Sequence, residues 1–313
     1  MGSPRFALPT LEALLEAGHE PALVVTLPDR EAGRGQHPTP SAVARAARER
    51  GLPLYQTGTL KTAASREPLE AARPDVIVVA SFGLLLPAAV LDLPPHGCLN
   101  VHPSLLPRHR GASPIPAALL AGDGETGVTI MLMDPGLDSG PILAQRALPI
   151  APDDDALSLE ASLAALGARL LVDNLPGWVS GAIIPRPQEA ALVTYAPKIR
   201  REDAWLDWTL PAELLLRRVR AYRAWPTAYT TLGGALLKVL RARVAPLTGA
   251  PAEPGRVGFP FRSGRRSGPP AVQTAAGLLV LEEVQPAGRS PMSGEEFARG
   301  QRALDGALLG GGS

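Results

Sequence analysis

Three polar residues in this sequence have side chains and spacing that could do chemistry: an amide, an imidazole and a carboxylate. Asn100 and His102 lie two positions apart at the end of an apolar run, so in a β-strand both side chains point to the same face. Asp138 lies between Gly136 and Gly140, and these glycines allow a sharp turn that would present the carboxylate to a cleft. We therefore take Asn100, His102 and Asp138 as the candidate catalytic residues.

This set suits acyl transfer to an amine without a covalent intermediate, for example attack of the amine on a formyl carbon. Attack on the formyl carbon creates an oxyanion, and each well-aimed N–H donor stabilises such a charge by roughly 3–4 kcal/mol. A carboxylate beside the imidazole can orient it or relay the proton of the amine. We see no activated serine and expect no metal. Each residue also has a structural interpretation, because buried Asn and His residues and turn Asp residues are common.

The first half of the chain alternates helical and strand-like segments, which predicts a doubly wound, Rossmann-like α/β domain. Ligands of such a domain lie beyond the carboxyl ends of its strands. Residues 75–80 (DVIVVA) form a β-branched run that is typical of a strand buried on both faces. We expect further strands at 22–26, 97–102, 127–133 and 141–147, and helices at 10–17 and 41–50.

The second half predicts a small OB-like β-barrel domain, because short strand-like runs alternate there with Gly and Pro clusters. One helix is expected at 210–222, with strands at 228–232, 236–244, 271–274 and 278–284. We place the first domain at residues 1–185, a linker at 186–202 and the second domain at 203–313.

The composition agrees with two globular domains, since 313 residues can bury two cores. The single cysteine, Cys98, excludes an internal disulfide and a Cys-based zinc site, and we interpret it as a core residue in a reducing compartment. The longest apolar runs are too short to span a membrane. We therefore expect a cytoplasmic protein without a membrane partner.

The charge is distributed unevenly. Residues 1–195 carry 14 Lys and Arg against 20 Asp and Glu, whereas residues 196–313 carry 17 against 10. A basic second half joined to a half with candidate catalytic residues indicates an enzyme with a polyanion-binding domain. The alternative is a general arginine bias, because 28 of the 31 basic residues are arginine.

Residues 99–107 (LNVHPSLLP), together with 136–140 (GLDSG), resemble the formyltransferase family that uses 10-formyltetrahydrofolate. The resemblance implies that the matching Asn100, His102 and Asp138 form the catalytic trio. It also implies two folate-contacting segments, whose residues are Ser104, Leu105, Leu106 and Pro107 in the first and Phe82, Gly83 and Leu84, beside the pterin, in the second.

Within that family the methionyl-tRNA formyltransferases are similar over nearly the whole chain, including 28–35 (PDREAGRG), 195–199 (YAPKI) and 284–289 (VQPAGR). This resemblance implies formyl transfer from 10-formyltetrahydrofolate to the amino group of methionyl initiator tRNA. Separately, we assume that the enzyme is a monomer. Arg34 then matches a residue that contacts the tRNA acceptor end. Arg217, Arg218 and Arg220 are further tRNA-binding candidates, or else form a solvated helix face.

Several other functions share parts of these patterns. A sugar-nucleotide formyltransferase has the same fold, and a glycinamide ribonucleotide formyltransferase shares the trio but needs a phosphate-binding turn where Pro4 lies. A folate hydrolase would need only the trio. A non-enzymatic RNA-binding protein would have no need of Asn100, His102 and Asp138 together.

The first residues carry one further expectation. Residues 1–4 (MGSP) match, by resemblance, the turn that follows the first strand of the family. That strand is internal in a doubly wound sheet. We therefore expect about five to eight apolar residues upstream, in keeping with ordinary strand lengths.

Overall fold

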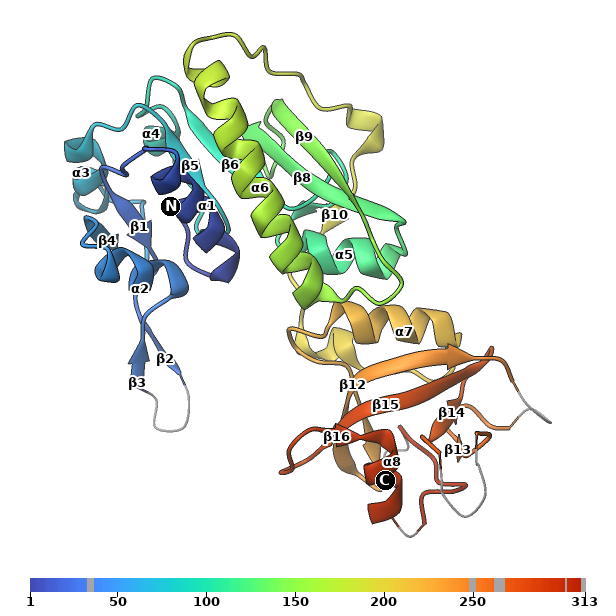
Figure 1. Ribbon diagram of the computed structural model, residues 1–313. Helices are drawn as coiled ribbons and strands as arrows, with labels where there is room; N and C mark the ends of the chain where they lie inside the picture. Colours follow the sequence, from blue (N-terminus) through green and yellow to red (C-terminus); the bar gives the residue numbers. More distant parts are fainter. Residues whose placement is uncertain (33–36, 248–251, 262–267, 302, 311–313) are drawn as a thin grey trace. The chain divides into compact units, whose positions relative to one another are not determined.

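The computed structural model describes residues 1–32, 37–247, 252–261, 268–301 and 303–310 (Figure 1). The chain divides into two compact units. The first unit contains Met1–Ile115, Gly124–Ala151 and Ser158–Pro197; the second contains Pro116–Asp123, Pro152–Leu157 and Lys198–Ser313. The second unit thus includes two short segments from the part of the chain that we assigned to the first domain.

The first unit is a mixed α/β structure, which confirms the predicted fold class. Strands β5 (Ile77–Val79) and β6 (Cys98–His102) are parallel. Strand β8 (Glu125–Leu132) runs antiparallel to β6, and β9 (Ile142–Pro149) antiparallel to β8. A separate parallel pair joins β1 (Val24–Thr26) to β4 (Leu54–Gln56). Two of the three pairings in this sheet are antiparallel, because β8 runs against β5, β6 and β9. Strands β8 and β9 are joined by a short loop, not by a crossover helix.

The helices of the first half are α1 (Leu8–Glu16), α2 (Ala42–Glu49), α3 (Ala63–Ala72), α4 (Ala88–Leu91) and α5 (Pro114–Ala121). Two of them begin at a capping side chain. The Ser41 hydroxyl accepts a hydrogen bond from the backbone N–H of Ala44 at the start of α2, and Thr62 accepts one from Ser65 at the start of α3. Such caps satisfy N–H groups that a helix leaves unpaired.

Helix α6 (Ala156–Val179) was not predicted from the sequence. It runs along the sheet of the first unit (Figure 1). The two pack closely at Gly167, where a Cβ atom would lie 2.6 Å from Val101 of β6 and 3.1 Å from Val128 of β8. Glycine at this position therefore lets the helix pack closely on β8 and on β6, the strand that carries Asn100 and His102.

Two short strand pairs complete the first unit. Strands β2 (Arg30–Ala32) and β3 (His37–Thr39) form an antiparallel hairpin. Strand β7 (Arg110–Gly111) pairs in parallel with β10 (Tyr195–Ala196). The segment expected to be a linker thus contributes a strand that pairs close to the candidate site.

The second unit is built on antiparallel strands, in the order β11 (Tyr229–Leu232), β12 (Ala235–Ala245), β15 (Leu278–Pro286), β14 (Ala271–Gln273) and β13 (Val257–Gly258), with β16 (Met292–Ser293) beside β15. Leu309 bridges to Leu232 and Leu308 to Arg256. Helices α7 (Ala212–Ala221) and α8 (Gly294–Gly300) add Leu215, Val219 and Phe297 to its core. The sequence predicted a small OB-like β-barrel here, and the structure confirms a second domain that is built on a sheet of antiparallel strands.

Within the described ranges, no helix is both long enough and apolar enough to cross a bilayer.

Candidate active site

The structure brings the three candidate catalytic residues together. Strand β6 carries Asn100 and His102 on one face, and the loop between β8 and β9 carries Asp138. The Asn100 amide donates a hydrogen bond to Asp138 Oδ1 at 3.4 Å, and His102 Nδ1 lies 3.8 Å from Asp138 Oδ2. The backbone N–H of Gly111 donates to the same Oδ2 at 2.8 Å. The carboxylate therefore lies between an amide, an imidazole and a backbone donor.

The loop that carries Asp138 is shaped by its own sequence. Asp138 has a left-handed φ of 48°, a conformation that Asp and Asn tolerate better than most residues. A Cβ atom on Gly140 would overlap the Leu132 carbonyl, so only glycine fits there. Asp134 accepts hydrogen bonds from the Ser139 hydroxyl at 2.8 Å and from the Gly136 N–H at 3.1 Å. The expectation that glycines would present Asp138 thus has a structural basis.

The surroundings of His102 favour a neutral imidazole. His102 is 4% exposed, and its burial lowers the pKa of the imidazole below the ordinary 6.5, although the negative charge of Asp138 acts in the opposite direction. Nε2 lies 3.1 Å from the carbonyl oxygen of His109. A carbonyl only accepts, so Nε2 carries the proton of the neutral ring. Nδ1, which faces Asp138, is then free to accept a proton.

Gln188 is a residue of this site that the sequence patterns did not single out. Its amide nitrogen donates to the carbonyl oxygens of Asp138 and Gly140, both at 2.8 Å. Its side-chain oxygen accepts from Arg110 Nε at 3.0 Å and Nη2 at 2.7 Å. Gln188 therefore holds the turn that positions the carboxylate. No local pattern could have revealed it, because 50 residues separate it from Asp138.

Thr194 holds the other side of the site. Its hydroxyl accepts a hydrogen bond from the backbone N–H of His109 at 2.9 Å, and its carbonyl accepts from the N–H of Arg110 at 2.9 Å. These bonds fix the peptide whose carbonyl oxygen faces His102. The end of the first unit, within the segment predicted to be a linker, thus helps to position the imidazole.

The first predicted folate segment is largely buried. Ser104 is fully buried, and its hydroxyl donates to the Arg108 carbonyl at 2.6 Å. Leu106 is 3% exposed, and its N–H donates to the Thr129 hydroxyl at 3.1 Å. Pro107 is also buried, whereas Leu105 is half-buried. Ser104, Leu106 and Pro107 therefore shape the loop from within, and Leu105 is the side chain of this segment nearest to solvent.

The second predicted folate segment follows β5 beside the catalytic strand. Val79, at the end of β5, pairs with Asn100. Phe82 is buried, Gly83 has a φ of 84°, and Leu84 is half-buried. Leu85 is 84% exposed. A half-buried and an exposed leucine therefore follow the strand that pairs with β6.

The predicted tRNA-binding residues have different outcomes. Arg34 lies outside the described residues, between strands β2 and β3. The base of this hairpin is fixed by Asp29, which accepts hydrogen bonds from Gln56 at 2.8 Å and Arg48 at 3.2 Å. The α7 arginines all donate to carbonyls of the protein: Arg217 to Ala121 at 3.2 Å, Arg218 to Asp203 at 2.8 Å and Arg220 to Asp154 at 2.5 Å.

The other candidate reactive groups do not form a second site. Cys98 is 1% exposed, and burial raises the pKa of its thiol to about 12, so the thiolate nucleophile is disfavoured. Among the described residues, no group of three or more His, Cys, Asp or Glu side chains could hold a metal ion.

Comparison with known proteins defines the class of enzyme. The sequence model of the formyl transferase family matches residues 1–175, and that of the formyl transferase C-terminal domain matches residues 198–302. A methionyl-tRNA formyltransferase from Thiobacillus denitrificans is 48% identical over 311 residues, which cover 99% of this chain and 98% of that relative. One from Chloroflexus aggregans is 48% identical over 304 residues, covering 97% and 96%.

Solved structures agree on the fold. An N-formyltransferase from Helicobacter canadensis, in complex with folinic acid and dTDP-3-aminofucose, has a TM-score of 0.64 at 16% identity, covering 90% of this chain and 97% of that one. HypX from Aquifex aeolicus in complex with tetrahydrofolic acid has a TM-score of 0.59 at 20% identity, covering 80% and 43%. With both matched domains, this chain is a formyltransferase. It belongs to the methionyl-tRNA formyltransferase family.

Proposed function

We propose that this enzyme transfers the formyl group of 10-formyltetrahydrofolate to the free amino group of methionyl initiator tRNA. The observation that carries the proposal is the cluster of Asn100, His102 and Asp138, in which a buried neutral imidazole faces a carboxylate 3.8 Å away. The names and the full-length similarity of the relatives support the same acceptor.

The site fits a reduced folate as formyl donor. Such a molecule carries a flat apolar ring system next to the reacting carbon, and here the exposed Leu85 and half-buried Leu84 lie beyond the strand that pairs with Asn100. When bound, the folate supplies an electrophilic formyl carbon on a nitrogen that can leave. Ser104, Leu106 and Pro107 keep the neighbouring loop in shape from within.

Asn100 and His102 have complementary roles in this reaction. The Asn100 amide donates a hydrogen bond to the formyl oxygen while that oxygen becomes an oxyanion. His102 Nδ1 accepts the proton that the amine loses as its nitrogen bonds to the formyl carbon, and returns it to the folate nitrogen as the old bond breaks. Asp138 stabilises the transient imidazolium. At the end of the reaction the formyl group is on the amine nitrogen of the methionine and the proton is on the folate nitrogen.

The second unit and the β2–β3 hairpin each contribute residues that bind the tRNA. Residues 196–313 carry 17 basic against 10 acidic residues, and a basic surface binds phosphates by releasing counterions. Exposed cations in this part of the chain include Lys198, Arg201, Arg241 and Arg289. Arg34 contacts the acceptor end, and Arg217, Arg218 and Arg220 support the surface by fixing α7. The enzyme acts in the cytoplasm as a monomer.

An acceptor comparison tests this proposal. Purified enzyme and 10-formyltetrahydrofolate are incubated with methionyl initiator tRNA, with a nucleotide-linked amino sugar, or without acceptor, and the release of tetrahydrofolate is followed. We expect release only with the tRNA. Turnover with the sugar would favour the sugar-nucleotide formyltransferase, and turnover without acceptor would favour the hydrolase.

A further inference from the structure

The catalytic strand β6 shares a row of polar side chains with β8 and β9. His102 lies opposite Thr129 of β8, and Thr129 lies opposite Gln145 of β9. Directly opposed residues of antiparallel strands project from the same face of the sheet, so the imidazole, the hydroxyl and the amide form one row. Residues 104–107, the first predicted folate segment, follow His102 along the chain and are hydrogen-bonded to this row.

The Thr129 hydroxyl is the centre of a buried hydrogen-bond network. Thr129 is fully buried. Its hydroxyl donates to the Ser104 carbonyl at 2.7 Å and accepts from the Leu106 N–H at 3.1 Å. It also accepts from the Gln145 amide nitrogen at 2.9 Å. A hydroxyl has one hydrogen to donate and two lone pairs, so each hydrogen-bonding position of this hydroxyl is filled.

Gln145 completes the network from β9. Its amide nitrogen donates to the Leu106 carbonyl at 2.7 Å as well as to Thr129. The N–H and the carbonyl of Leu106 are therefore both held by side chains of the row. Because β8 and β9 belong to the sheet that carries His102, the network fixes the segment 104–107 to the same framework as the imidazole.

Gly127 leaves room for the segment on the same face of β8. It lies two residues before Thr129 and therefore faces the same side. A Cβ atom on Gly127 would lie 2.5 Å from Leu105 Cδ2, so Leu105 packs directly on the backbone of β8. Leu105 is half-buried. The packing on β8 thus determines where the segment presents the side chain that a ligand can contact.

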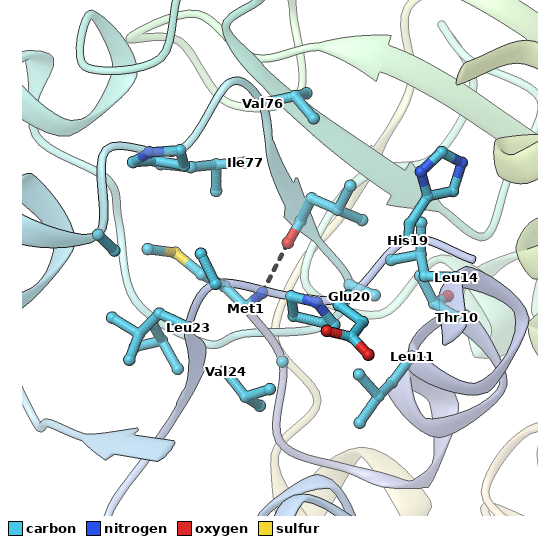
Figure 2. Close-up of a pocket in the computed structure, with 18 of the residues that line it drawn as sticks. Met1, Thr10, Leu11, Leu14, His19, Glu20, Leu23, Val24, Val76 and Ile77 are labelled. Atoms are coloured by element: carbon cyan, nitrogen blue, oxygen red, sulfur yellow. Dashed lines mark hydrogen bonds between the residues drawn. The ribbon is translucent and has the colours of Figure 1, made fainter. Parts of the chain in front are cut away.

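The first unit also contains a cavity of about 450 Å³, which is lined by residues of α1, β1 and β5 (Figure 2). Its described lining includes neither the catalytic cluster nor any residue of the two predicted folate segments. The shape of the folate site therefore depends on how the loops beside β6 are held, and the segment 104–107 is held by Thr129 and Gln145.

We infer that Thr129 and Gln145 are positioning residues for the formyl donor. They act through the segment 104–107, whose backbone they hold beside His102, and the inference rests on the proposed use of a reduced folate. Without the network the segment adopts other conformations, and the affinity of a ligand falls by the factor by which its binding conformation is depopulated. Each lost hydrogen bond corresponds to about a two- to tenfold change in such a population.

Thr129→Val tests this inference, because valine keeps the shape of threonine and removes the hydroxyl. The Kd for folinic acid is measured by calorimetry, and the KM values are measured with 10-formyltetrahydrofolate and methionyl initiator tRNA. Thr129→Val should raise the Kd and the KM for the folate about tenfold or more and leave the KM for the tRNA nearly unchanged. Thr129→Ser keeps the hydroxyl and should restore most of the folate affinity.

Thr126→Val is the matched control. Thr126 is a buried threonine of the same strand, and its hydroxyl makes no hydrogen bond among the described residues. This variant should leave the Kd and both KM values at those of the parent enzyme. Gln145→Met should also weaken folate binding. Combined with Thr129→Val it should lose less than the product of the two single losses, because both substitutions act on Leu106.

An unchanged Kd for folinic acid in Thr129→Val would overturn the inference, even if the variant melts at a lower temperature. An equal loss in Thr126→Val would also overturn it, because any change in β8 would then have the same effect. Folinic acid binds without an acceptor, so transfer to a nucleotide-linked amino sugar would contradict the proposed function while the Kd values still decide the role of Thr129. A parent enzyme that does not bind folinic acid would overturn both.

Discussion

Replacing Asp138 by Asn tests the electrostatic role of this carboxylate while its shape is kept. In the structure Asp138 Oδ2 lies 3.8 Å from His102 Nδ1, and the side chain accepts hydrogen bonds from Gly111 and Asn100. Asn at this position can still accept through its remaining carbonyl oxygen. The substitution Asp138→Asn therefore removes the negative charge beside the imidazole and one of these two hydrogen bonds.

The magnitude follows from the distance. Two unit charges 3.8 Å apart attract by about 4 kcal/mol at an effective dielectric constant of about 20. In the parent enzyme this attraction arises when His102 becomes an imidazolium in the transition state, and the Asp138→Asn variant lacks it. Since about 1.4 kcal/mol corresponds to a tenfold change in rate, kcat should fall by about a thousandfold.

Steady-state kinetics with methionyl initiator tRNA measures this change. The KM for the folate should remain within a few-fold of the parent value, because the charge acts on the proton transfer and not on folate binding. Asp134→Asn is the matched control. Asp134 lies in the same loop and accepts a hydrogen bond from the Ser139 hydroxyl, and its substitution should lower kcat at most a few-fold. A kcat for Asp138→Asn within tenfold of the parent enzyme would refute the reasoning.

Four further predictions concern Asn100, Gln188, the imidazole of His102, and Arg34, which was assigned from the sequence resemblance. Asn100→Ala should lower kcat about a hundredfold or more if the amide is an oxyanion donor. A loss of only about tenfold in single-turnover assays would exclude that role. Gln188→Ala should lower kcat about tenfold with little change in either KM, because it frees the Asp138 turn; an unchanged kcat would contradict this. Since the pKa of His102 is lowered from 6.5, kcat/KM should be level at neutral pH and fall only below pH 6.5. The free energy of unfolding should decrease over the same acidic range, because the unfolded state binds a proton at His102 more readily than the folded state. Arg34→Ala should raise the KM for tRNA and reduce its salt dependence, whereas an equal change in the KM for folate would indicate misfolding.

Much of this fold could be predicted because its strands are local apolar runs. The run 75–80 predicts β5, and Asn100 and His102 share a face because of their spacing in β6. Strand orientation could not be predicted in the same way, because nothing local to β8 and β9 states that they pair with each other and antiparallel to β6. Helix α6 was missed, although it is the longest helix among the described residues.

The site shows the same division between local and non-local information. The glycines around Asp138 predict its turn, whereas Gln188 and Thr194 reach the site through contacts between residues far apart in the sequence. The α7 arginines show the limit in another way. A sequence cannot tell whether a guanidinium group faces a phosphate or a carbonyl of its own chain, and here Arg217, Arg218 and Arg220 donate to such carbonyls.

The transfer of a labelled formyl carbon tests the central claim most directly. 10-Formyltetrahydrofolate labelled at the formyl carbon is incubated with the enzyme and with methionyl initiator tRNA, with methionyl elongator tRNA, or with uncharged initiator tRNA. The account predicts one labelled formyl group on each methionine of the charged initiator tRNA and little label elsewhere. Label that stays in the folate, appears as free formate, or reaches a tRNA that carries no methionine would contradict it.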